Sequence, residues 1–107
     1  MLEFIETSQF PRLVAEYLSD DEYCRLQEHL NVQPESGELI RESGGVRKLR
    51  WALGKRGKRG GLRVIYYLRQ SRQQIWLLTL YDKSTISNMP AHVLKAIKET
   101  IEDEQDN

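Results

Sequence analysis

Residues 44–83 have the sequence GGVRKLRWALGKRGKRGGLRVIYYLRQSRQQIWLLTLYDK, and this stretch decides the fold. Three runs within it are rich in Val, Ile, Leu, Trp and Tyr, and glycine or polar residues separate them: 46–53, 62–68 and 74–81. Such runs predict β-strands. Residues 69–73 are few enough for a hairpin loop, so we expect the last two strands to be antiparallel neighbours.

The apolar residues that precede this stretch recur at helical spacing. Tyr23, Leu26 and Leu30 mark one face of a helix, and an earlier helix is marked by Phe10, Leu13, Val14 and Tyr17. Between the two, Ser19 and Glu22 have the spacing of a capping box, in which each residue bonds the backbone of the other. Two consecutive helices are therefore predicted before the first long strand.

One further element is predicted at each end of the chain. Residues 3–7 (EFIET) form a short first strand. A last helix has Pro90 in its first turn and Ser87 or Asn88 as its cap, and its apolar stripe consists of Val93, Leu94, Ile97 and Ile101.

These elements predict an α+β fold, a small antiparallel-rich sheet with two N-terminal helices and one C-terminal helix. We expect the helices to pack on one face of the sheet. The 107 residues fit one domain, spanning residues 1–107. No stretch of the sequence resembles a signal peptide, no apolar run approaches the ~20 residues of a membrane span, and there is a single cysteine. We therefore expect a cytoplasmic protein without membrane contact.

The net charge of zero hides a strong segregation of charge along the chain. Residues 1–40 carry nine acidic and two basic side chains, whereas residues 41–83 carry two acidic and twelve basic ones. Residues 84–107 carry five acidic and two basic side chains. Such segregation predicts a one-sided surface that attracts a polyanion, and nucleic acid is the partner that it favours.

The residue types of common catalytic and metal sites are sparse. His29 and His92 each lie in a predicted helix that we expect far from the basic segment, and neither has a second ligand at metal-binding spacing. Cys24 lacks an obvious base. The acids at 20–22 are explained by helix capping. We therefore expect no metal site and no cofactor.

The glycine-rich segment 54–61 (GKRGKRGG) does not match a phosphate-binding P-loop, because it lacks the required Lys-Ser or Lys-Thr and precedes a strand. Glycine nevertheless allows close approach of a backbone to a ligand, and its neighbours supply phosphate contacts. With Arg47, the predicted RNA- or ribosome-binding residues are Lys55, Arg56, Lys58 and Arg59.

Alternation along the strands gathers further cations on one face. Lys48 and Arg50 project from one side of their strand, opposite to Arg47. Arg63 begins an otherwise apolar run, where a charge is costly unless it lies at the end of the sheet or meets an anion. Tyr81 and Lys83 share a face at the end of the third strand. The predicted patch therefore comprises Lys48, Arg50, Arg63, Tyr81 and Lys83.

The segment GGVRKLRWALGKRGKRGGLRVIYYL, followed by IWLLTLYDKS, resembles the HigB branch of the RelE/ParE superfamily, the toxins of bacterial type II toxin–antitoxin pairs. The similar features are the R-K-L-R strand, the G-K-R-G-G-x-R-x-I-Y-Y run and the terminal Y-x-K. The resemblance covers nearly the whole chain, and the order of the predicted helices and strands also fits the family.

This resemblance implies a ribosome-dependent endoribonuclease that cuts mRNA in the A site of the 30S subunit, stops translation and is neutralised by a cognate antitoxin. A helix-turn-helix antitoxin would provide any contact with DNA. Lys48, Arg50 and Arg63 match basic family positions, and Lys83 falls where RelE has an arginine. The family's C-terminal tyrosine aligns near Met89, so that role is vacant or falls to Tyr81.

The resemblance further implies a metal-free mechanism, in which Arg63 stabilises the phosphate. Lys48 or Tyr81 is the base, and Lys83 or Arg50 is the acid or charge stabiliser. Two other functions compete with this one. ParE-type relatives inhibit DNA gyrase, and a non-catalytic RNA-binding module would use the same cations.

Overall fold

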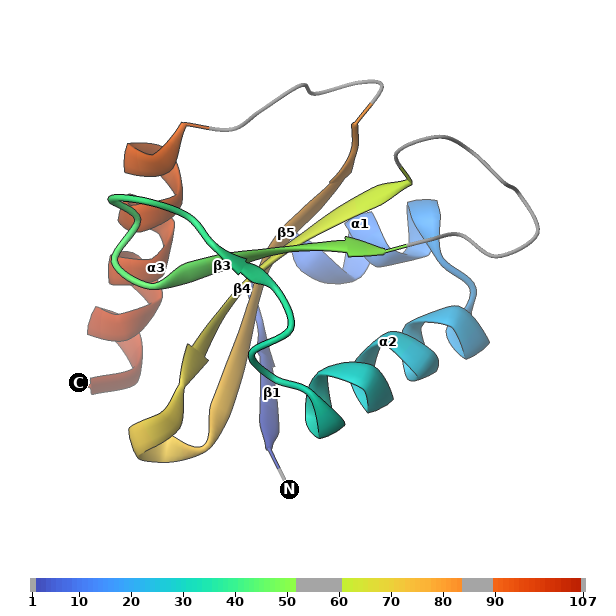
Figure 1. The fold of residues 1–107 in the computed structure, drawn as a ribbon, viewed down its shortest axis with the longest axis horizontal. Helices are drawn as coiled ribbons and strands as arrows, with labels where there is room; N and C mark the ends of the chain where they lie inside the picture. The colour runs from blue at the N-terminus through green and yellow to red at the C-terminus, as the bar shows by residue number, and fades with distance from the viewer. Residues whose placement is uncertain (1, 52–60, 84–89, 107) are drawn as a thin grey trace.

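The computed structural model describes the backbone of residues 2–51, 61–83 and 90–106, with side chains up to residue 103. Two helices follow the first strand, four strands come next, and a last helix ends the described chain, as Figure 1 shows. In order, they are β1 (Glu3–Glu6), α1 (Phe10–Tyr17), α2 (Asp20–Val32), β2 (Glu38–Leu39), β3 (Val46–Trp51), β4 (Leu62–Arg69), β5 (Gln74–Asp82) and α3 (Ala91–Asp106).

The strands form one sheet in the order β1-β5-β4-β3-β2. Strand β1 pairs with β5 in parallel, and the other neighbours are antiparallel. A short 3-10 helix over Gln70–Arg72 joins β4 to β5, and Gln73 closes it with a φ of 52°. The predicted hairpin and the predicted α+β class are both confirmed.

The helices cover both faces of the sheet, so the prediction that they share one face is wrong. Helices α1 and α2 bury Phe10 and Leu26 against one face, and α3 buries Leu94 against the other. Figure 1 shows α3 on the opposite side of the sheet from α1 and α2. The reason is that β4 and β5 are apolar at nearly every position, so both of their faces need a cover.

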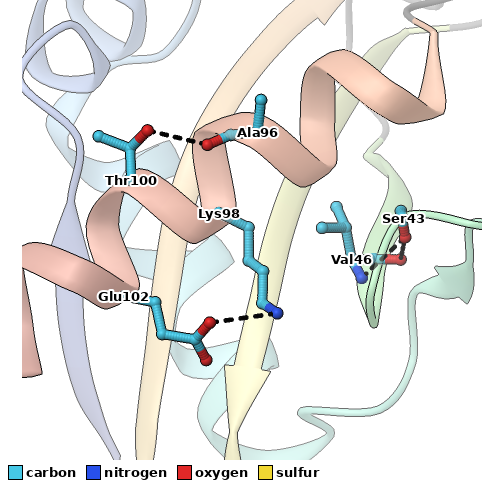
Figure 2. Close-up of polar contacts among 6 residues, drawn as sticks. All are labelled: Ser43, Val46, Ala96, Lys98, Thr100 and Glu102. Atoms are coloured by element: carbon cyan, nitrogen blue, oxygen red, sulfur yellow. Dashed lines mark hydrogen bonds and ion pairs between the residues drawn. The ribbon is translucent and has the colours of Figure 1, made fainter.

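Strand β2 was not predicted, and it depends on the turn that leads into β3. The hydroxyl of Ser43 donates to the carbonyl of Ile40 at 2.7 Å and accepts from the backbone N–H of Val46 at 3.0 Å. Gly44 and Gly45 follow with φ of 77° and 103°, a backbone that favours glycine. Figure 2 shows this turn beside α3.

Helix α3 is held on its face by a buried lysine as well as by its apolar stripe. Lys98 is 9% exposed, and its Nζ lies 4.9 Å from the centroid of the Tyr67 ring. The same Nζ lies 3.4 Å from Oε1 of Glu102, as Figure 2 shows. Pro90 immediately precedes the helix, and its carbonyl accepts from the N–H of Leu94. The predicted caps Ser87 and Asn88 lie outside the described residues.

The predicted capping box at the start of α2 is confirmed. The hydroxyl of Ser19 accepts from the N–H of Glu22 at 3.2 Å, and the N–H of Ser19 donates to Oε1 of Glu22 at 2.8 Å. We expect Ser19→Ala to lower the free energy of unfolding by about 1 kcal/mol, measured by urea denaturation, because the backbone N–H of Glu22 loses its acceptor.

The control for this prediction is Ser8→Ala, another exposed serine, which does not cap a helix. It should change the free energy of unfolding by less than about 0.5 kcal/mol. Equal effects of the two variants would show that the capping box contributes nothing to stability.

Candidate active site

Three of the predicted patch residues form a row across the sheet. Arg50 of β3 pairs with Arg63 of β4, and Arg63 pairs with Tyr81 of β5. Cross-strand partners lie on the same face of a sheet, and Tyr81 packs in the core beneath α3. The row Arg50–Arg63–Tyr81 therefore lies on the α3 face.

The remaining two patch residues lie beside this row. Lys48 is two residues from Arg50 on β3, pairs with Ile65 and shares the α3 face. Lys83 immediately follows β5, is exposed, and its backbone N–H donates to the carbonyl of Gly61 at 3.5 Å. The structure thus places Lys48, Arg50, Arg63 and Tyr81 on one face, and Lys83 at the same end of the sheet.

The row passes from solvent into the protein. Arg50 is exposed, whereas the Arg63 side chain is only 5% exposed and that of Tyr81 3%. Nη1 of Arg63 is 3.5 Å from the carbonyl oxygen of Leu62. The row therefore presents positive charge from Arg50 at the surface and from Arg63 just beneath it.

Burial also decides the protonation state of Tyr81. Loss of solvent raises the pKa of its phenol above the ordinary value of 10.0, and the positive charge of Arg63 opposes this increase without cancelling it. Tyr81 therefore carries its proton at neutral pH. A protonated phenol cannot accept a proton, so the raised pKa argues against the role of base that the resemblance implied for Tyr81.

A pocket of about 320 Å³ opens next to the row. It lies between the β2 segment and the start of α3, and it includes Lys48 and Tyr81 of the patch. Sequence reasoning missed its other polar residues, Glu38 and Arg41, because β2 has only two residues and no periodicity. The pair of glycines before β3 was the one signal of a turn that could have revealed a preceding strand.

Arg47 lies on the other face, as the alternation predicted, and there it supports the chain. Its Nη1 donates to the carbonyl oxygens of Glu35 at 3.1 Å and Gly37 at 2.8 Å. Contact between Arg47 and RNA stays a prediction. The predicted loop residues Lys55, Arg56, Lys58 and Arg59 lie outside the described residues, and so does Met89.

One of the two histidines lies closer to the basic segment than expected. The ring of His29 is 5.3 Å from that of Trp51 at the end of β3, so the prediction that both histidines are distant is wrong for His29. The pair lies on the side that α2 covers, opposite to Arg63. His92 is exposed on α3.

The sulfur of Cys24 donates to Glu28 at 3.5 Å, and this hydrogen bond raises the pKa of the thiol. Within the described ranges, no cluster of three His, Cys, Asp or Glu residues could hold a metal ion. The helices in these ranges include none long and apolar enough to cross a membrane.

The fold is that of the small RelE-like α+β proteins. The chain superimposes on a free-state arginine-to-alanine mutant of the Escherichia coli toxin RelE with a TM-score of 0.60 and 9% sequence identity, covering 91% of this chain and 96% of that one. A conserved hypothetical protein, HP0892 from Helicobacter pylori, superimposes with a TM-score of 0.56 and 14% identity over 78% of this chain and 97% of its own. No family model matches the sequence.

Proposed function

We propose that this protein is the toxin of a type II toxin–antitoxin pair, of the HigB type, and that it is a ribosome-dependent endoribonuclease. The observation that carries the proposal is Arg63, a nearly buried guanidinium between Arg50 and the protonated Tyr81. The similarity of fold to a protein described as the toxin RelE supports the same function.

The residues of the row suit cleavage of RNA by its own 2′-hydroxyl. The 2′-oxygen forms a bond to phosphorus as the bond from phosphorus to the 5′-oxygen breaks. The uncharged amine form of Lys48 accepts the 2′-hydroxyl proton, and Tyr81 donates a proton to the 5′-oxygen as it leaves. Arg63 stabilises the additional negative charge on the pentacovalent phosphate, with Arg50 and Lys83 supplying further positive charge. The products are a 2′,3′-cyclic phosphate and a 5′-hydroxyl end.

This mechanism needs no metal and no cofactor, because arginine and lysine supply the positive charge. Its partners are mRNA, the A site of the 30S subunit and a cognate antitoxin, which we expect to bind DNA through a helix-turn-helix. Action on ribosomes requires the cytoplasm. The domain responsible is the single domain of residues 1–107.

The experiment that tests this function is induced expression with separate labelling of new protein and new DNA, followed by mapping of mRNA 5′ ends. We expect protein synthesis to stop first and new 5′ ends to appear within codons. A gyrase inhibitor would instead stop DNA synthesis first. Binding of RNA without any new 5′ ends would favour a non-catalytic module and contradict the proposal.

Replacing Tyr81 tests its role as proton donor. We expect Tyr81→Phe to slow cleavage about 100-fold or more, because a positioned acid contributes this much to proton transfer. The wild-type rate should not fall through ionisation of Tyr81 between about pH 7 and pH 9, since burial raises its pKa above the usual tyrosine value. Cleavage of ribosome-bound mRNA measures both.

Tyr17→Phe is the matched control, because Tyr17 is a half-buried tyrosine on α1, away from the row. It should cleave at the wild-type rate. Undiminished cleavage by Tyr81→Phe would remove Tyr81 from the mechanism.

A further inference from the structure

The pocket beside the row has an apolar floor that can accept the flat face of a ring. Ile65 is fully buried, and Leu94 of α3 is 1% exposed. Ile40 and Ala91 form part of the wall, and Ala91 leaves space because its side chain is small. A volume of about 320 Å³ is at the lower end of small-molecule sites, which suits one nucleobase.

The pocket is continuous with the proposed cleavage site, because Lys48 and Tyr81 line both. An RNA whose phosphate contacts Arg63 therefore has an adjacent nucleotide within reach of this pocket. Single-stranded RNA is commonly recognised through unstacked bases that enter such pockets and bond along their Watson–Crick edges.

Among the described residues that line this pocket, Glu38 carries the one carboxylate, and Lys48 and Arg41 are the cations. The Cα of Glu38 is paired with that of Lys48. In the part of the chain that the structure describes, no ion pair joins these two side chains. A carboxylate beside a phosphate site repels phosphate. Binding of the RNA sugar-phosphate backbone therefore does not explain a carboxylate at this position.

The backbone before Glu38 is held in place from two sides. The Tyr66 hydroxyl accepts from the N–H of Gly37 at 2.8 Å and donates to the carbonyl of Pro34 at 2.8 Å. Arg47 donates to the carbonyl of Gly37 at 2.8 Å. Glu38 is therefore attached to a fixed segment, as a specificity residue requires.

We infer that this pocket binds a guanine base next to the cleaved phosphate, with Glu38 as its acceptor. Guanine carries two neighbouring donors on its Watson–Crick edge, N1–H and the 2-amino group, and these match the two oxygens of a carboxylate. Adenine, cytosine and uracil place an acceptor beside their donor, which a carboxylate repels. The inference rests on the proposed endoribonuclease function.

The first test is Glu38→Gln, assayed by mapping cleavage positions in ribosome-bound mRNA. Wild type should cut preferentially next to guanine, and the variant should lose about tenfold or more of that preference. Glu35→Gln is the matched control, because it removes the same charge from an exposed glutamate that lines a different pocket. It should retain the wild-type preference.

The second test fills the pocket without changing charge. Ala91→Phe should reduce cleavage about tenfold or more, because the ring occupies the space of the base. Ala96→Phe is the control, as Ala96 is exposed on the same helix and away from the pocket. It should cleave at the wild-type rate, and thermal melting verifies that both variants fold.

The outcomes separate this inference from the proposed function. If wild type and Glu38→Gln cut mRNA with the same preference for guanine, or if Ala91→Phe cleaves at the wild-type rate, the inference of a guanine pocket is wrong. The proposed nuclease function is then still supported. If wild type does not cut mRNA at all, the proposed function is wrong, and the guanine pocket fails with it.

Discussion

Arg63→Ala should abolish mRNA cleavage and the arrest of growth at expression levels at which the wild-type protein arrests cells. Arg63 is 5% exposed and lies between Arg50 and Tyr81, where it can contact the phosphate as negative charge accumulates. Removal of one preorganised donor to such a charge costs roughly 10²–10³-fold in rate. Mapping of mRNA 5′ ends after induction measures the loss.

The control is Arg12→Ala, which removes the same charge from an exposed position on α1. It should cut and arrest as wild type does. Because Arg63 is buried, circular dichroism and thermal melting must establish that Arg63→Ala is folded, and Arg50→Ala, at an exposed position of the same row, provides a second variant. Full cleavage by folded Arg63→Ala would remove the phosphate-stabilising role on which the mechanism depends.

Trp76→Ala should have the largest effect on stability, a loss of about 3–5 kcal/mol in the free energy of unfolding. The side chain is fully buried beneath α3, and its Nε1 donates to Oε1 of Gln74 at 3.0 Å. Its ring lies 5.3 Å from that of Tyr67, and the guanidinium of Arg69 lies 5.2 Å from its centroid. Truncation leaves a cavity and removes these contacts together. Denaturant unfolding measures the loss.

The other tryptophan provides the comparison. Trp51 is only half-buried, at the end of β3, so Trp51→Ala should destabilise the protein by a smaller amount. Equal losses for the two variants would mean that the α3 face contributes less to stability than its burial indicates.

Most elements could be predicted because local patterns determine them. The capping box of Ser19 and Glu22 depends on two residues three apart, and the alternation of Lys48 and Arg50 follows from the pleat of a strand. The prediction that all helices cover one face of the sheet was wrong, because it depends on how the elements pack together and not on a local pattern. The continuous apolar run of β4 indicated a strand covered on both faces, but it was assigned a single covered face.

The sequence was enough to select most residues of the candidate site. It was not enough to predict which of them are cross-strand neighbours or which are buried. Cross-strand neighbours follow from pairing register, which shifts between Ile65 and Tyr66 of β4 and cannot be inferred from periodicity. The raised pKa of Tyr81 follows from its burial beneath α3, which the sequence does not show, so sequence alone placed Tyr81 among the candidate bases. Glu38 was missed because a two-residue strand has no pattern. The roles of Lys55, Arg56, Lys58 and Arg59 stay predictions.

The most direct test of the central claim uses purified protein and ribosomes that hold a defined codon in the A site. The account predicts one cut within that codon, leaving a 5′-hydroxyl end, and no cut in the same mRNA without ribosomes. Intact ribosome-bound mRNA, in the presence of folded protein at a concentration that arrests translation in an extract, would contradict it.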